Sequence, residues 1–160
     1  MKIEIKKICY KNQQQAQDLI FLLNHYAMDP MGGGKELNPY VTENLVAKLA
    51  KLAHASTYIA YANEKPAGLL NCFESLSTFS AKPLINIHDL MVHSDYRGLG
   101  ISQEMLKRLV DDAEEQGCCK ITLEVLEGNK VALNAYKKFG FENYQLDPEV
   151  GQAIFMEKKL

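Results

Sequence analysis

The sequence lacks the features that mark several classes of protein. Its formal net charge is only −2 over 160 residues, so there is no electrostatic reason to expect nucleic-acid binding. No apolar run approaches the ~20 residues of a membrane span. Residues 1–6 alternate like a strand and lack the apolar stretch of a signal peptide. These absences predict a cytoplasmic protein with neither a nucleic-acid nor a membrane partner.

Metal sites and two common phosphate motifs are also absent from the sequence. The four cysteines, Cys9, Cys72, Cys118 and Cys119, show neither metal-ligand spacing nor a disulfide framework. No Gly-Lys-Ser/Thr tripeptide of a P-loop occurs. Gln103 stands where a dinucleotide fingerprint would have its third glycine. We therefore expect no metal, and no nucleotide site of either kind.

Length and apolar spacing predict one domain over residues 1–160, with 47% hydrophobic residues to fill its core. Periodicity predicts strands at 2–10, 57–62, 67–73, 84–93, 120–126, 141–146 and 152–158, and helices at 12–27, 42–54, 101–116 and 129–139. Thr42 is the predicted N-cap of the second helix. This order predicts an α+β fold: a mixed, mostly antiparallel sheet of about seven strands with helices on both faces.

The most informative segment runs from Tyr96 to Ser102, between the strand at 84–93 and the helix that follows. A strand, a glycine turn and a helix bring several N–H groups and the positive end of a helix dipole to one point, which suits a phosphate. Arg97 can add charge-assisted bonds, and Gly98 and Gly100 lack the Cβ that would hold a ligand away. The alternative is a tight turn that needs glycine only for its dihedral angles.

Two spaced motifs then point to one family. The first is Arg97-Gly98-Leu99-Gly100-Ile101-Ser102, and the second is Asn129-x-x-Ala132-x-x-x-Tyr136-x-x-x-Gly140-Phe141. Together they resemble the GNAT superfamily of acetyl-CoA-dependent N-acyltransferases, whose signature is Arg/Gln-x-x-Gly-x-Gly/Ala at a strand-to-helix turn. Ser102 departs from that signature, but serine is small and its hydroxyl can donate to a phosphate.

The resemblance implies a site for acetyl-CoA as co-substrate, with no metal. Its residues would be Met91, Val92, Arg97, Gly98, Leu99, Gly100, Ile101, Ser102, Asn129, Ala132 and Tyr136. The amides of residues 98–102, with Arg97, would hold the pyrophosphate, and Met91 and Val92 would present backbone groups to the pantetheine and acetyl portions. The fourth and fifth strands would splay at this level to admit the thioester.

The transfer of an acetyl group to an amine needs an acid and a base, because an alkyl amine with a pKa near ~10 is protonated at neutral pH. By the resemblance, Tyr136 is the general acid that faces the CoA sulfur; the alternative is a core aromatic. His88 is the candidate base, predicted on the strand face of Asn86 and Leu90, with Asp89 on the opposite face. A satisfied, partly buried histidine is the alternative, and a water chain would then be the base.

The acceptor is predicted to be a small-molecule amine or an amino-acid-like amine. Asp29, Glu74 and Tyr26 could form an acidic, aromatic-edged pocket beside the glycine-rich residues 28–34, although a plain flexible connector is an equal alternative. Neither motif contains a cysteine, so direct attack in a ternary complex is expected rather than an acetyl-enzyme. The alternatives are a protein N-terminal acetyltransferase and a non-catalytic CoA-binding sensor, and a homodimer is left open.

Overall fold

The computed structural model describes residues 1–160 as two compact units, Met1–Leu123 and Glu124–Leu160. The first unit contains the sheet and helices α1, α2 and α3, and the second contains helix α4 and the C-terminal segment. None of the helices combines the length and the apolar character that a membrane crossing requires. One domain over the entire chain stays a prediction.

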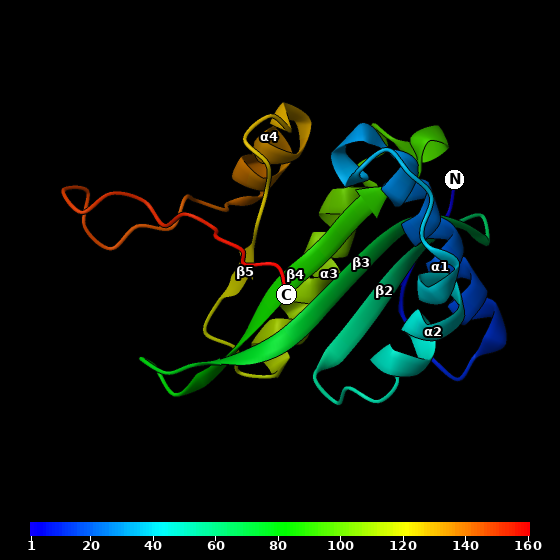
Figure 1. Ribbon diagram of the computed structural model, residues 1–160, viewed down its shortest axis with the longest axis horizontal. Helices are drawn as coiled ribbons and strands as arrows, with labels where there is room; N and C mark the ends of the chain where they lie inside the picture. Colours follow the sequence, from blue (N-terminus) through cyan, green and yellow to red (C-terminus); the bar gives the residue numbers. More distant parts are fainter. The chain divides into compact units, whose positions relative to one another are not determined.

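The first unit is built on a five-stranded sheet in the order β1-β2-β3-β4-β5 (Figure 1). The strands are β1 (Ile3–Lys7), β2 (Ala55–Ala62), β3 (Lys65–Ser77), β4 (Lys82–Val92) and β5 (Ile121–Leu123). Neighbouring strands are antiparallel, except that β5 runs parallel to β4. The predicted α+β class with a mixed, mostly antiparallel sheet is confirmed.

The prediction of about seven strands is not confirmed, because residues 141–146 and 152–158 form no strand. The pairing there is a single isolated bridge between Gln145 and Gln152. Phe155, in the second of these segments, is 77% exposed. Alternating apolar residues suit a half-buried strand, but they do not supply the neighbouring strand whose hydrogen bonds define it.

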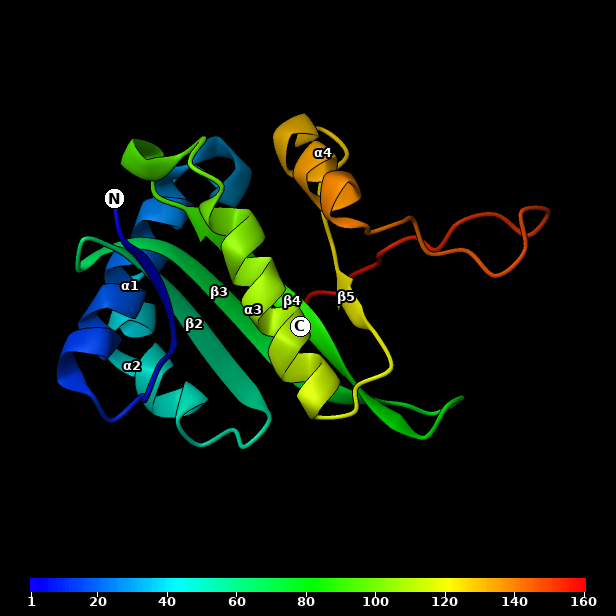
Figure 2. The ribbon, with the colours of Figure 1, turned by 180° about the vertical axis from the view of Figure 1, so that it is seen from behind.

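Helices cover both faces of the sheet. The helices are α1 (Gln13–Met28), α2 (Pro39–Leu49), α3 (Ile101–Glu115) and, in the second unit, α4 (Lys130–Phe139), with 3-10 turns η1 (Pro30–Gly32) and η2 (Ser94–Tyr96). Helices α1 and α2 lie on one face, and α3 lies on the other, where Figure 2 shows it crossing the strands.

Helix α2 begins earlier than its apolar spacing predicts. Asn38, and not Thr42, is the N-cap: its side chain accepts a backbone N–H of the first turn at 2.9 Å. Pro39 follows at the first helical position, where the missing N–H costs nothing. Leu49 of the predicted stripe is buried, whereas Leu52 lies beyond the helix end and is exposed.

Both faces of the sheet carry a packed core. Leu19 and Leu22 of α1 pack with Ile59 and Leu69 on the first face. On the second face, α3 approaches β3 so closely that a Cβ on Gly68 would lie 2.9 Å from the Met105 sulfur. Since side chains alternate along a strand, the odd-numbered residues of β3 face α1 and the even-numbered ones face α3.

The ladder between β4 and β5 is short. It runs from Ile85 opposite Ile121 to Ile87 opposite Leu123, although β4 itself continues to Val92. The residues after Leu123 belong to the second unit. The splay of these two strands beyond Leu123 therefore stays a prediction.

Candidate active site

The glycine turn lies between β4 and α3, as the sequence predicts. Gly98 and Gly100 have φ angles of 77° and 78°, in the left-handed region that side chains disfavour. Helix α3 begins at Ile101 with no side chain capping it. The backbone N–H groups of residues 98 to 102 have no acceptor within the chain. This turn therefore offers a row of unsatisfied donors at the positive end of a fifteen-residue helix, which is suited to a phosphate.

Arg97 is held by two groups beside this turn. Its Nη2 donates to Asp29 Oδ2 at 2.9 Å, and its Nε donates to the Val92 carbonyl oxygen at 3.2 Å. Asp29 also accepts the Met31 N–H at 2.9 Å. That bond, followed by the guanidinium of Arg97, lowers the pKa of Asp29. The sequence predicts Arg97 at the cofactor and Asp29 at the acceptor; the structure shows that the two form an ion pair, and both roles stay predictions.

His88 is the extra residue of a β-bulge in β4. Asn71 lies opposite Asp89 and the next residue, Cys72, lies opposite Ile87, so that the strand register skips His88. Directly opposed residues share a face, which places Asp89 on the face of α1. His88 Nδ1 lies 3.4 Å from Asp89 Oδ1, so the two side chains are neighbours. The predicted placement of Asp89 on the opposite face was therefore wrong.

The bulge also changes the surroundings of the imidazole. Phe73, opposite Asn86, faces α1, and the His88 ring meets it edge-on with 5.7 Å between ring centroids. Leu90 lies opposite Leu70, whose side chain faces α3. His88 therefore shares the face of Asn86, as predicted, but not that of Leu90. At 67% exposure its side chain is open to solvent, as an acceptor amine would require.

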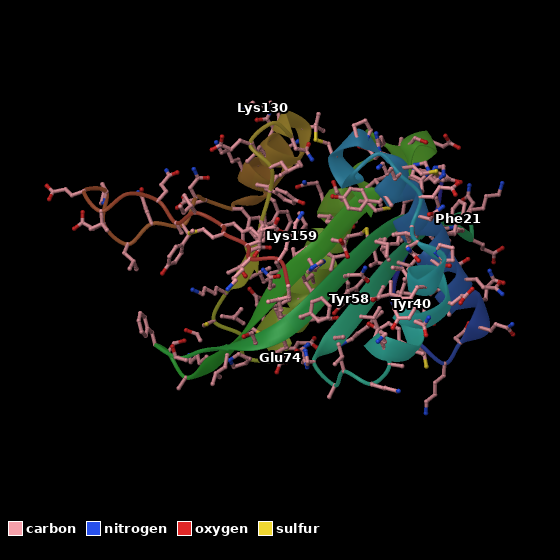
Figure 3. The ribbon with its side chains drawn as sticks, in the orientation of Figure 1. Phe21, Tyr40, Tyr58, Glu74, Lys130 and Lys159 are labelled. Carbon is pink, nitrogen blue, oxygen red and sulfur yellow. The ribbon has the colours of Figure 1, made fainter.

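The three predicted acceptor residues do not come together. Tyr26 lies on the α1 face, where burial and then the nearby Asp89 and Asp29 carboxylates raise its pKa. Glu74 follows Phe73 and lies on the α3 face, where its charge acts on the Cys118 thiol. Figure 3 shows Glu74 near the lower end of the sheet. The sheet thus separates Glu74 from Tyr26.

The second motif lies in the second unit. Asn129 caps α4, as predicted, by accepting the Ala132 N–H at 3.1 Å. The rings of Tyr136 and Phe141 lie edge to face, 5.8 Å apart. The aromatic cluster considered as the alternative role for Tyr136 is therefore present, and the role of Tyr136 as an acid stays a prediction.

Sequence reasoning missed two groups of polar side chains in the first unit. A hydrogen-bonded row of Thr57, Asn71 and Asp89 crosses three strands. His25 of α1 also stacks on His93 just after β4, with 3.9 Å between ring centroids. Thr57 and Asn71 interrupt otherwise apolar strands, which is a usable signal, whereas nothing in the sequence links His25 to a residue so far along the chain. No group of three or more metal-ligating side chains is present.

Comparison with known proteins agrees with this geometry. The family model described as Acetyltransferase (GNAT) family matches residues 20–141, which include the glycine turn and α4. The chain belongs to the GNAT acetyltransferase family. The match extends from α1 to the end of the second motif, so both predicted motifs lie inside it.

Among the relatives, a Bos taurus thialysine N-epsilon-acetyltransferase is 35% identical over 43% of this chain and 40% of its own length. A Streptomyces lavendulae streptothricin acetyltransferase is 30% identical over 66% of this chain and 54% of its own length. An uncharacterized N-acetyltransferase of Methanocaldococcus jannaschii is 29% identical over 56% and 40%. This GNAT chain thus spans about half or less of the length of these curated relatives.

Solved structures share the fold. An aminoglycoside acetyltransferase from an uncultured soil sample superposes with a TM-score of 0.78 at 20% identity, covering 99% of this chain and 96% of that one. AAC(6')-Iy, in complex with a bisubstrate analog that contains CoA, gives 0.76 at 14% identity over 100% of both chains. At these identities the likeness shows the GNAT fold alone.

Proposed function

We propose that this GNAT chain is an N-acetyltransferase that moves the acetyl group of acetyl-CoA to a small primary amine by direct attack in a ternary complex. The observation that carries the proposal is the turn at residues 97–102. The N–H groups of residues 98–102 have no acceptor in the chain and lie at the N-terminus of α3. The family membership adds the class of reaction.

The turn is chemically suited to the pyrophosphate of CoA. A diphosphate offers several anionic oxygens to a row of N–H donors and to a helix dipole. Apart from the adjoining residues of the chain, no heavy atom lies within 4 Å of where a Cβ would stand on Gly98 or Gly100, so ligand atoms can approach the backbone there. Met91, Val92, Asn129 and Ala132 are proposed from the family motif to contact the remainder of the cofactor.

Acetyl transfer has a simple balance. A base accepts one proton of the ammonium, the amine nitrogen bonds to the thioester carbonyl carbon, and the C–S bond breaks. The leaving thiolate takes a proton from an acid, and the nitrogen gives its second proton to the deprotonated acid, so that the products are the amide, the CoA thiol and one proton held by the base. We assign the base to His88, whose exposed imidazole stands beside a carboxylate, and the acid to Tyr136, from its place in the motif. Each such group contributes roughly 10²–10⁴-fold in rate.

A small cationic amine is the proposed acceptor. Asp89 and Tyr26 lie on the face of His88 and supply a carboxylate and an aromatic hydroxyl there. Asp29 is already paired with Arg97, and Glu74 lies on the other face, so neither supports the acceptor site as first predicted. Relatives are named for thialysine and streptothricin as acceptors, which favours small molecules over protein N-termini.

The test is a free-thiol release assay with acetyl-CoA over a panel of diamines, basic amino acids, aminoglycosides and N-terminal peptides. We expect thiol release that depends on a small amine, with the acetylated product found by mass spectrometry. Acetylation restricted to the peptides would establish the N-terminal acetyltransferase instead. Acetyl-CoA binding without transfer to any amine would favour the sensor.

A further inference from the structure

A row of polar side chains crosses the α1 face of the sheet where apolar residues would be expected. Thr57 on β2, Asn71 on β3 and Asp89 on β4 lie directly opposite one another in the strand register. Thr57 and Asn71 are only 1% and 5% exposed. Buried polar groups are tolerated only when they are hydrogen-bonded, and apolar residues would fill the space at lower cost. The presence of polar residues at these core positions is therefore not explained by stability alone.

The chemistry of the side chains fixes the direction of every hydrogen bond in the row. A carboxylate only accepts, so Asn71 turns its amide nitrogen to Asp89 Oδ2, at 2.9 Å. The amide oxygen then faces Thr57, whose hydroxyl donates to it at 2.6 Å. With that proton used, Thr57 accepts from the Tyr10 hydroxyl, 3.0 Å away. All the donors thus point toward the carboxylate of Asp89.

The other oxygen of Asp89 is directed at His88. Asp89 Oδ1 lies 3.4 Å from His88 Nδ1, and the bulge in β4 is what places the two consecutive side chains on one face. Catalytic hydrogen bonds are often this long before substrate binds. A carboxylate can accept a hydrogen bond from Nδ1 only when Nδ1 carries a proton. In a neutral imidazole the other nitrogen, Nε2, then holds the lone pair.

We propose that Asp89, oriented by Asn71 and Thr57, is the positioning residue for His88: it holds the proton on Nδ1, so that Nε2 is the unprotonated nitrogen that accepts the ammonium proton of the acceptor. This inference rests on the proposed function. When Nε2 takes that proton, Asp89 faces the resulting imidazolium and stabilises it. Other groups near this pair include Tyr26 of α1, whose pKa is raised in part by the charge of Asp89, and Phe73, whose ring lies 6.0 Å from that of His54.

The substitution Asp89→Asn gives a sharp test, because the row dictates how the new amide must sit. The Asn71 amide nitrogen needs an acceptor, so the oxygen of the new side chain turns toward it. The new amide nitrogen then faces His88 Nδ1 and can donate only to its unprotonated form. The proton moves to Nε2, and His88 can no longer act as a base.

The first measurement is the tautomer of His88, read from ¹⁵N shifts of the imidazoles, with the His88 signals identified by their loss in His88→Gln. We expect the Nδ1–H form in the parent and the Nε2–H form in Asp89→Asn. The matched control is Asp111→Asn, which removes a carboxylate paired with Lys107 on the exposed side of α3 and leaves the tautomer unchanged. An Nε2–H form in the parent overturns the inference without any variant.

The second measurement is the rate. Asp89→Asn lowers kcat with the best amine by ~10²-fold or more, and in a His88→Ala background the same change lowers it less than about threefold, because the two residues act as one unit. Equal losses in both backgrounds would mean that Asp89 is merely structural and would overturn the inference. The tautomer requires no turnover: if the parent acetylates no amine but shows the predicted tautomer and its switch, the proposed function fails and the Asp89–His88 pair stands.

Discussion

Gly100 combines two constraints that can be separated by mutation. Its φ of 78° disfavours any side chain, and it lies within the proposed pyrophosphate turn. We expect Gly100→Asp to weaken acetyl-CoA binding by ~10²-fold or more, since it adds a negative charge where a diphosphate should lie. Gly117 has a φ of 71° with nothing near its Cβ position, at the other end of α3. Gly117→Asp therefore carries the same backbone strain, and calorimetry should show parent-like binding. Equal affinities of all three proteins would remove the turn from the cofactor site.

Asp29 would compete for Arg97 with an anion bound at the proposed pyrophosphate turn. Because its carboxylate pairs with the guanidinium at 2.9 Å, Arg97 cannot offer all of its donors to a pyrophosphate. We expect Asp29→Asn to strengthen acetyl-CoA binding by about two- to fivefold, a small effect because the Arg97 side chain is half-exposed and screened by salt. The gain should shrink as the salt concentration rises. A weaker binding in Asp29→Asn would show that the pair instead holds Arg97 in its binding position.

Tyr136 has two candidate roles with opposite signatures. Tyr136→Phe keeps the ring that contacts Phe141 and removes only the hydroxyl. If the hydroxyl protonates the thiolate, kcat falls by ~10²-fold or more while acetyl-CoA binding is kept. Unchanged kcat with a shifted melting temperature would assign Tyr136 to the aromatic cluster alone. Phe139→Leu is the matched control, because it alters the same cluster without touching a hydroxyl.

The glycine turn could be predicted because its geometry is local: a turn, two glycines and a helix start are adjacent in the sequence. The Arg97–Asp29 pair joins positions 68 residues apart, and no local pattern indicates it. The predicted sheet face of Asp89 was wrong because one inserted bulge residue reverses the alternation of side chains along a strand. The residue types from Asn86 to Val92 do not indicate the position of that bulge.

Among the elements, α3 was predicted to within one residue, and the strands predicted at 57–62 and 67–73 pair as the β2–β3 hairpin, whose second strand begins two residues earlier, at Lys65. Helix α3 has a full apolar stripe, and the hairpin closes through Asn63 and Glu64, both with positive φ, as a two-residue turn requires. The C-terminal segment was predicted incorrectly, since its apolar residues alternate without forming a ladder. The local sequence pattern is thus sufficient to predict a helix that buries its own apolar stripe. It is insufficient to predict a strand, which forms only where a neighbouring strand supplies hydrogen bonds.

The packing of α3 gives a prediction of stability. Leu109 has no exposed surface, on the helix that covers one face of the sheet. We expect Leu109→Ala to lower the free energy of unfolding by about 2–5 kcal/mol, through lost burial and the cavity left behind. Leu76, exposed on β3, is the control, and Leu76→Ala should change it by about 0.5 kcal/mol or less. Denaturant unfolding of both variants measures this, and similar values would mean that α3 is not packed as described.

The free energy of unfolding should depend on pH through His25, which stacks on His93. Burial, followed by the charge of His93 and then of Arg97, lowers the pKa of His25 in the folded protein, while the Asp95 and Asp29 carboxylates oppose this. His25 Nε2 also accepts the Ser94 N–H at 3.4 Å, which it can do only when unprotonated.

The direction of this pH dependence is set by whether His25 binds its proton first in the folded or in the unfolded protein. As pH falls below the unfolded value of about 6.5, His25 protonates in the unfolded chain before it does in the folded one. The free energy of unfolding is therefore complete above that pH, declines through the window down to the lowered folded pKa, and levels off below it. We expect the melting temperature of the parent to fall between pH 7.5 and pH 5.5, and to fall less in His25→Gln, whose amide cannot titrate.

Ser94 begins the turn that leads to Arg97. Loss of the hydrogen bond from the Ser94 N–H to His25 should therefore also loosen the proposed cofactor site, so that acetyl-CoA binding weakens over the same pH range in the parent. Identical pH slopes in both proteins would show that His25 titrates alike in the folded and unfolded states.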